Sequence, residues 1–78
     1  MSVTVLYFAA LRDAAGCASE ALDTPADLAA LYDSLRARHG FSFEARALRV
    51  AVDGEFRDWS YPLADGAEVA FIPPVSGG

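Results

Sequence analysis

One amphipathic helix between runs of strand-like sequence is the feature that most limits the folds open to this chain. Its large apolar residues recur at the i, i+3, i+4 and i+7 spacing that places them on one side of a helix. They are Leu28, Leu31, Tyr32 and Leu35. A single apolar stripe has to be buried against another layer of structure. The pattern therefore predicts an α+β domain in which one main helix packs on one sheet.

The ends of this helix carry signals of their own. Thr24 is a residue type that caps helices, Pro25 suits the first helical position, and Asp27 comes three residues after the cap. These residues predict a helix that is capped by Thr24 and has Pro25 in its first position. His39 and Gly40 predict its end, and we expect His39 to interact with that helix end.

The segment before the helix has the composition of a hairpin. Residues 3–8 are rich in β-branched and aromatic types and predict a strand. Residues 9–15 predict a short helical turn that ends at Gly16, and residues 17–22 predict a second strand. Alternation along the first strand gives two sets of side chains. One set is Val3, Val5 and Tyr7, and the other is Thr4, Leu6 and Phe8.

The segment after the helix contains three further predicted strands. Residues 41–47 predict a connection, and residues 48–52 alternate as a strand does. Asp53–Gly54 is a strong signal for a two-residue hairpin turn, followed by a short strand over 55–57. Residues 59–64 read as irregular, with Trp59 and Tyr61 packing that segment. A second turn at Asp65–Gly66 leads into the last strand, residues 67–72.

The predicted order is β-β-α-β-β-β, which fits the β-grasp (ubiquitin-like) fold: a mixed sheet of about five strands with one main helix. Residues 1–72 form the predicted domain. Pro73 and Pro74 end the last strand because neither can donate a hydrogen bond to a neighbouring strand. Residues 73–78 are then a flexible tail that ends in Gly77 and Gly78.

Composition excludes several classes of function. The net charge is −5, and the six basic residues are all arginine. Acidic balance disfavours nucleic acid and suits a partner with a basic surface. No apolar run approaches the length that crosses a bilayer, and no secretory signal pattern opens the chain, so we expect no membrane partner and a cytoplasmic protein. The single cysteine, Cys17, predicts neither a disulfide nor a metal site and reads as a buried apolar residue of the second strand.

The C-terminal tail is the feature that suggests chemistry. Pro73 and Pro74 keep its base extended, and glycines without a Cβ can thread a narrow channel. Gly77 and Gly78 thus present an α-carboxylate on a thin stalk. A carboxylate is a poor electrophile, but adenylation makes it a good one, and sulfur can then displace AMP to leave a thiocarboxylate. We expect Gly78 to be the reacting residue and Gly77 to serve tail insertion.

Strand alternation also predicts an apolar patch on the sheet face away from the helix, because one helix cannot cover both faces. Its residues are Leu6, Phe8, Phe56, Ala70 and Ile72. Such a patch usually marks a partner site. The alternative is that the loop over residues 57–64 covers it.

Two stretches closely resemble the MoaD family, the small subunits of molybdopterin synthase. They are residues 5–12, Val-Leu-Tyr-Phe-Ala-Ala-Leu-Arg, and residues 62–78, which end in Pro-Pro-Val-Ser-Gly-Gly. The resemblance implies that a MoeB-like enzyme consumes ATP to adenylate Gly78, with no cofactor bound to the chain itself. A persulfide donor then supplies sulfur for the thiocarboxylate.

The same resemblance implies the partner. The tail, with Pro73, Pro74 and Val75, inserts into a MoaE-like large subunit within a heterotetramer of two small and two large subunits. There the thiocarboxylate sulfur goes to a pyranopterin precursor of molybdopterin, and the large subunit supplies the catalytic pocket. The fold alone does not separate MoaD from ThiS carriers. Carriers for thiamine, cysteine or tRNA thiolation, a ubiquitin-like modifier, and a binding module with an incidental Gly-Gly end stay open.

Overall fold

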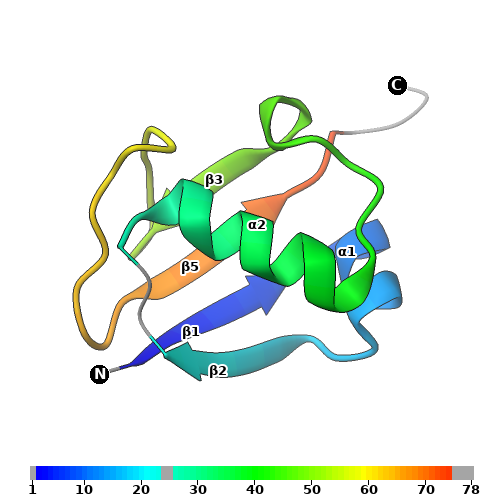
Figure 1. Ribbon diagram of the computed structural model, residues 1–78, viewed down its shortest axis with the longest axis horizontal. Coiled ribbons are helices and arrows are strands. Elements are labelled where there is room, and N and C mark those ends of the chain that lie inside the picture. Colours follow the sequence, from blue (N-terminus) through cyan, green and yellow to red (C-terminus); the bar gives the residue numbers. More distant parts are fainter. Residues whose placement is uncertain (1, 24–25, 75–78) are drawn as a thin grey trace.

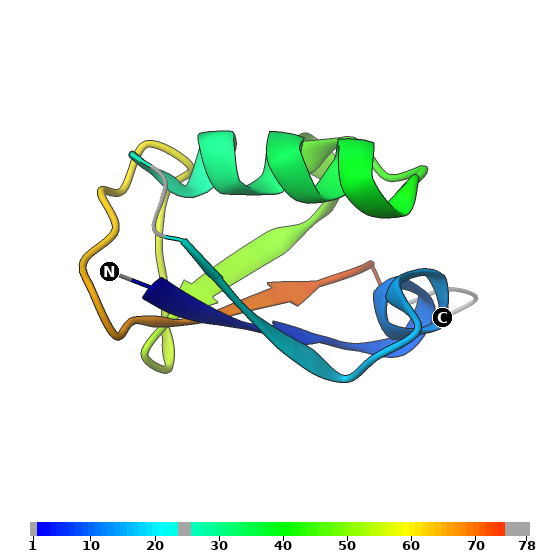
Figure 2. The same ribbon diagram turned by 60° about the horizontal axis from the view of Figure 1, so that its bottom comes forward.

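A five-stranded mixed sheet carries one long helix on one of its faces (Figures 1 and 2). The computed structural model describes residues 2–23 and 26–74. The elements in chain order are β1 (Ser2–Tyr7), α1 (Ala9–Ala15), β2 (Ser19–Asp23), α2 (Leu28–His39), the 3-10 turn η1 (Ala45–Ala47), β3 (Arg49–Val52), β4 (Glu55–Phe56) and β5 (Glu68–Ile72).

The order of strands across the sheet is β2-β1-β5-β3-β4. The first and last strands of the chain, β1 and β5, are parallel and lie next to each other, while the other pairs are antiparallel. The helix α2 lies across this sheet, as Figure 2 shows. The predicted β-grasp fold is therefore confirmed, and it places the end of β5 in the interior of the sheet rather than at an edge.

Burial follows the predicted alternation of the strands. Val3, Val5 and Tyr7 on β1 and Val69 and Phe71 on β5 are almost completely buried against the helix. The apolar stripe of α2 supplies the other half of this core, with Leu28, Leu31, Tyr32 and Leu35 all buried. The alternate residues of these strands are less buried. One face of the sheet therefore builds the core against α2, and we call the opposite face, which is turned away from α2, the outer face.

The start of α2 differs from the prediction. The helix begins at Leu28, and Asp27 is its N-cap, because the Asp27 carboxylate accepts a hydrogen bond from the backbone N–H of Ala30 at 2.9 Å. Asp27 itself has extended backbone angles, so the predicted helix with Thr24 as its cap and Pro25 in its first position is wrong. Thr24 and Pro25 lie outside the described residues. No helix in the described ranges is long and apolar enough to span a bilayer.

Three other boundaries can be compared with the prediction. Gly40 ends α2 in the left-handed conformation, as predicted, with φ of 71°. Asp53 and Gly54 both have positive φ, which is the conformation that a tight two-residue hairpin requires. The second strand, however, begins at Ser19. Cys17 therefore lies before β2 and is only half-buried, contrary to its expected place in a strand.

Candidate functional site

The C-terminal tail begins at the end of β5, a strand that is hydrogen-bonded to a neighbouring strand on each side. We call this end of β5 the root of the tail. Ile72 ends β5, and Arg49 at the start of β3 is its register partner. Pro73 is half-buried and Pro74 is exposed, and neither has a backbone N–H that could extend the sheet. The expected stop at the two prolines is thus confirmed. Val75, Gly77 and Gly78, to which the sequence assigns insertion and chemistry, lie outside the described residues.

A row of small and apolar side chains crosses the outer face beside this root. The strand register joins Leu6 to Ala70, Ala70 to Ala51, and Ala51 to Phe56, so the row runs over β1, β5, β3 and β4 without a break. We call these four residues the outer row. Three of them belong to the predicted patch, and Ala51 is a member that the sequence interpretation left out. Its two central alanines make the middle of the row shallow.

The aromatic members of the predicted patch lie in solvent. Phe8 is 46% exposed and Phe56 is 61% exposed, and no other large apolar residue of the described chain is as exposed. Phe8 continues the extended backbone for one residue beyond β1 and is the N-cap of α1. Leu6, Ala70 and Ile72 are each half-buried. Four of the five predicted patch residues thus lie on strands of the sheet, and Phe8 lies directly after the end of β1.

The loop over residues 57–64 does not cover this face. Its Trp59 ring stacks on Phe71, with centroids 5.8 Å apart, and also packs against Tyr32. The carbonyls of Trp59 and Tyr61 accept hydrogen bonds from the first N–H groups of α2, at Ala29 and Leu28. The loop therefore belongs to the helix side of the sheet. Figure 2 shows no described helix or long loop across the outer face.

A polar cluster joins three elements on the helix side, and the sequence interpretation missed it. The carboxylate of Glu20 on β2 accepts a hydrogen bond from the hydroxyl of Tyr7 on β1, and His39 Nε2, at the end of α2, lies 2.6 Å from the same oxygen. His39 thus binds Glu20 as well as ending the helix. The available signal was that Glu20 alternates with Leu22, which places a charged residue on the inward side of β2.

Burial and hydrogen bonding act in opposite directions on this carboxylate. Burial alone would raise the pKa of Glu20, but the hydrogen bonds from Tyr7 and His39, with the nearby charge of Arg38, lower it below its ordinary value. Burial and the same hydrogen bond raise the pKa of Tyr7. The contacts of Glu20 with Tyr7 and His39 therefore tie β1, β2 and α2 together.

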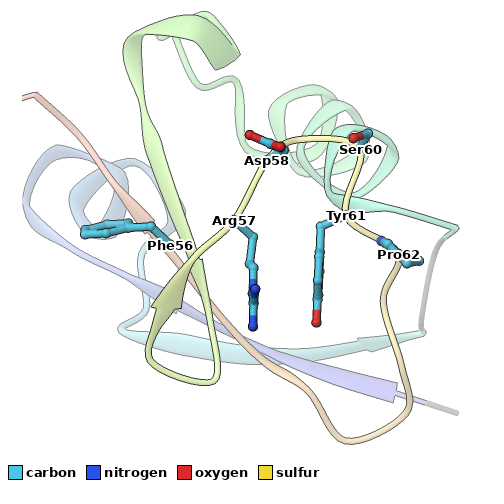
Figure 3. Close-up of a pocket in the computed structure, with 6 residues that line it drawn as sticks. All are labelled: Phe56, Arg57, Asp58, Ser60, Tyr61 and Pro62. Carbon is cyan, nitrogen blue, oxygen red and sulfur yellow. The ribbon is translucent and has the colours of Figure 1, made fainter.

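A hollow of about 480 Å³ lies beside β4 (Figure 3). It is lined by Phe56, Arg57, Asp58, Ser60, Tyr61 and Pro62. Figure 3 shows the Arg57 and Tyr61 side chains running side by side, and the guanidinium carbon lies 4.8 Å from the ring centroid. Arg57 also pairs with Glu55 at 2.8 Å.

The chemical content of the described residues is limited. The lining of the hollow has one carboxylate, Asp58, and one aliphatic hydroxyl, Ser60, and no side-chain hydrogen bond joins the two within the described ranges. Within residues 2–23 and 26–74, no group of three or more His, Cys, Asp or Glu side chains is placed to hold a metal ion. What this part of the chain offers is an apolar face next to the root of the tail.

Comparisons with known proteins agree with this geometry. The model of the ThiS family matches residues 5–78. The molybdopterin synthase sulfur carrier subunit of Escherichia coli is 37% identical over an alignment that covers 97% of this chain and 99% of that protein.

Two solved structures are also similar. SAMP1 from Haloferax volcanii is 29% identical with a TM-score of 0.81, and each chain is fully covered. A chain of the complex of subunits 1 and 2 of molybdopterin-converting factor from Helicobacter pylori is 25% identical with a TM-score of 0.72, again with full coverage of both chains. With its family model matched from residue 5 to residue 78, this chain belongs to the ThiS family.

Proposed function

We propose that this protein is the sulfur carrier of molybdopterin synthesis and that Gly78 is its reacting residue. The observation that carries the proposal is the near full-length likeness to a molybdopterin synthase sulfur carrier subunit, in a family match that extends to Gly78. The described structure supports it with a strand that stops at Pro73 and Pro74 beside an uncovered apolar face.

In the proposed cycle, an activating enzyme of the MoeB type uses ATP. The Gly78 carboxylate attacks the α-phosphate, pyrophosphate leaves, and an acyl adenylate forms. A persulfide sulfur then attacks the acyl carbon and AMP leaves. A thiol cleaves the resulting sulfur–sulfur bond, and Gly78 is left as a thiocarboxylate. Because activation consumes ATP, we place this cycle in the cytoplasm. The chain itself needs no bound cofactor.

The thiocarboxylate then gives its sulfur to a pyranopterin precursor inside a large subunit of the MoaE type. Two deliveries build the dithiolene of molybdopterin, and two carriers and two large subunits form the assembly. The six residues from Pro73 to Gly78 span at most about 20 Å when fully extended. The large subunit must therefore sit close to Ile72. We place its docking surface on Leu6, Phe8, Phe56, Ala70 and Ile72, with Pro73, Pro74 and Val75 entering it.

Genetic rescue tests the proposal. The chain is expressed in one strain that lacks its molybdopterin sulfur carrier and in another that lacks its thiamine sulfur carrier. We expect restored molybdoenzyme activity in the first strain only, and no rescue by a variant without Gly78. Rescue of the thiamine strain alone would assign the chain to another carrier pathway. Rescue of the molybdopterin strain by the truncated variant would contradict carrier chemistry at Gly78.

A further inference from the structure

Arg49 is the one basic residue that the described strands place on the outer face. On β3, Val50 and Val52 are buried against the helix, so Arg49 and Ala51 point the other way. Arg57, which follows β4, lies instead against Tyr61 of the helix-side loop. The opposite ends of the strands carry acidic residues on the outer face, namely Glu68 on β5 and Asp23 on β2.

The position of Arg49 is fixed by two neighbours. It is the register partner of Ile72, the last strand residue before the tail, and directly paired side chains in a sheet lie about 5 Å apart. Its guanidinium carbon also lies over the Phe56 ring, 5.7 Å from the centroid. Arg49 therefore lies between the tail root and the end of the outer row.

Arg49 is exposed and forms no ion pair with any residue in the described ranges 2–23 and 26–74. A partner that receives Gly78 has to dock within about 20 Å of Pro73, because six residues reach no further. The proposed docking surface includes Ile72, so a partner seated on it also covers Arg49, the register partner of Ile72. A guanidinium that is covered without a counter-charge loses its hydration without compensation, which is strongly unfavourable.

We propose that Arg49 binds a carboxylate of the large subunit at the mouth of the channel that receives the tail. This inference rests on the proposed function. The two ends of the outer face therefore differ in charge: Arg49 lies at the end where the tail begins, and acidic residues lie at the opposite end. An apolar row alone permits the partner to bind in either orientation along the strands. The Arg49 contact selects the orientation that points the tail into the channel.

The substrate is not the group that Arg49 binds. In the proposed cycle the six residues after Ile72 reach into the channel, and when fully extended they span about 20 Å from the register pair of Arg49 and Ile72. An arginine side chain cannot bridge that distance. Its effect is therefore on assembly of the two subunits and not on the sulfur transfer step itself.

The test is the affinity of the full chain for the large subunit of the same organism, measured at several salt concentrations. Arg49→Ala is expected to raise the Kd by about tenfold at low salt and Arg49→Glu by more. Arg49→Lys keeps the charge but loses the planar two-donor geometry, so its effect is smaller. The difference between the unaltered chain and Arg49→Ala should shrink as salt rises.

Arg57→Ala is the matched control, because it removes the same charge on the helix side of the neighbouring strand. It should leave the Kd unchanged, and the melting temperatures of all variants show whether they are folded. Equal Kd values for the unaltered chain, Arg49→Ala and Arg49→Glu at every salt concentration would overturn this inference alone. No binding by the unaltered chain would overturn the proposed function and this inference together.

Discussion

The indole ring of Trp59 stacks on the phenyl ring of Phe71, with the two planes only 11° from parallel. Phe71 points inward from β5, so this stack holds the irregular segment after β4 on the helix side of the sheet. The same segment supplies carbonyl acceptors to the first turn of α2. As a result, the loop leaves the Phe56 side chain 61% exposed.

Replacing Trp59 should therefore destabilise the fold, whereas replacing an aromatic on the outer face should not. We expect Trp59→Ala to lower the free energy of unfolding by about 2 kcal/mol, because it removes a half-buried ring and leaves a cavity against Phe71 and Tyr32. Phe56→Ala should change it by about 0.5 kcal/mol or less, because Phe56 is 61% exposed. Urea denaturation measures both. Equal losses would show that the loop does not anchor the helix side.

A charge on the outer face should disrupt assembly without unfolding the chain. We expect Phe8→Asp to weaken binding to the large subunit by at least about tenfold, since it places a carboxylate in an apolar contact. Ser34→Asp puts the same charge on the exposed side of α2 and serves as the control. Titration calorimetry gives the affinities, and thermal melting shows that each variant is folded. Retained binding by a folded Phe8→Asp variant would mean that the partner docks elsewhere.

The Glu20 cluster should make stability depend on pH in the acid range. The folded-state pKa of Glu20 is lowered, so the folded state releases this proton more readily than the unfolded chain does. Its contribution is complete above the unfolded pKa of about 4.3 and is lost as the pH falls through the folded-state value. We expect the unfolding free energy of Glu20→Gln to fall less steeply below about pH 5 than that of the unaltered chain.

Denaturant titrations from neutral to acid pH measure this difference. Glu44→Gln is the control, because Glu44 pairs only with the exposed Arg46. It should follow the unaltered chain at every pH. If Glu20→Gln shows the same acid dependence as the unaltered chain, the hydrogen bonds from Tyr7 and His39 do not stabilise the ionised carboxylate.

Most of the fold was predictable because its signals are local and periodic. Alternation correctly assigned Val5 and Tyr7 to the core and Leu6 to the outer face, and the 3.6-residue stripe correctly located α2. The turn at Asp53 and Gly54 was equally predictable, since few residue pairs accept two positive φ angles.

The errors and omissions come from contacts between distant parts of the chain. Thr24 and Asp27 are both good capping residues, and the structure selects Asp27, whose backbone also pairs with Pro62 in an isolated bridge. Likewise, no short-range pattern joins His39 to Glu20, nineteen residues away. The pairing of Arg49 with Ile72 depends on the order of strands in the sheet. Chemistry at Gly78 stays a prediction from sequence and family membership.

The measurement that tests the central claim most directly is the intact mass of the chain after incubation with its activating enzyme, ATP and a sulfur source. The account predicts a single exchange of oxygen for sulfur, located in the C-terminal peptide and absent from a variant that lacks Gly78. Peptide mapping is needed because oxidation of Met1 or Cys17 adds nearly the same mass. An exchange that persists without Gly78, or no exchange under conditions in which the enzyme adenylates the chain, would contradict the account.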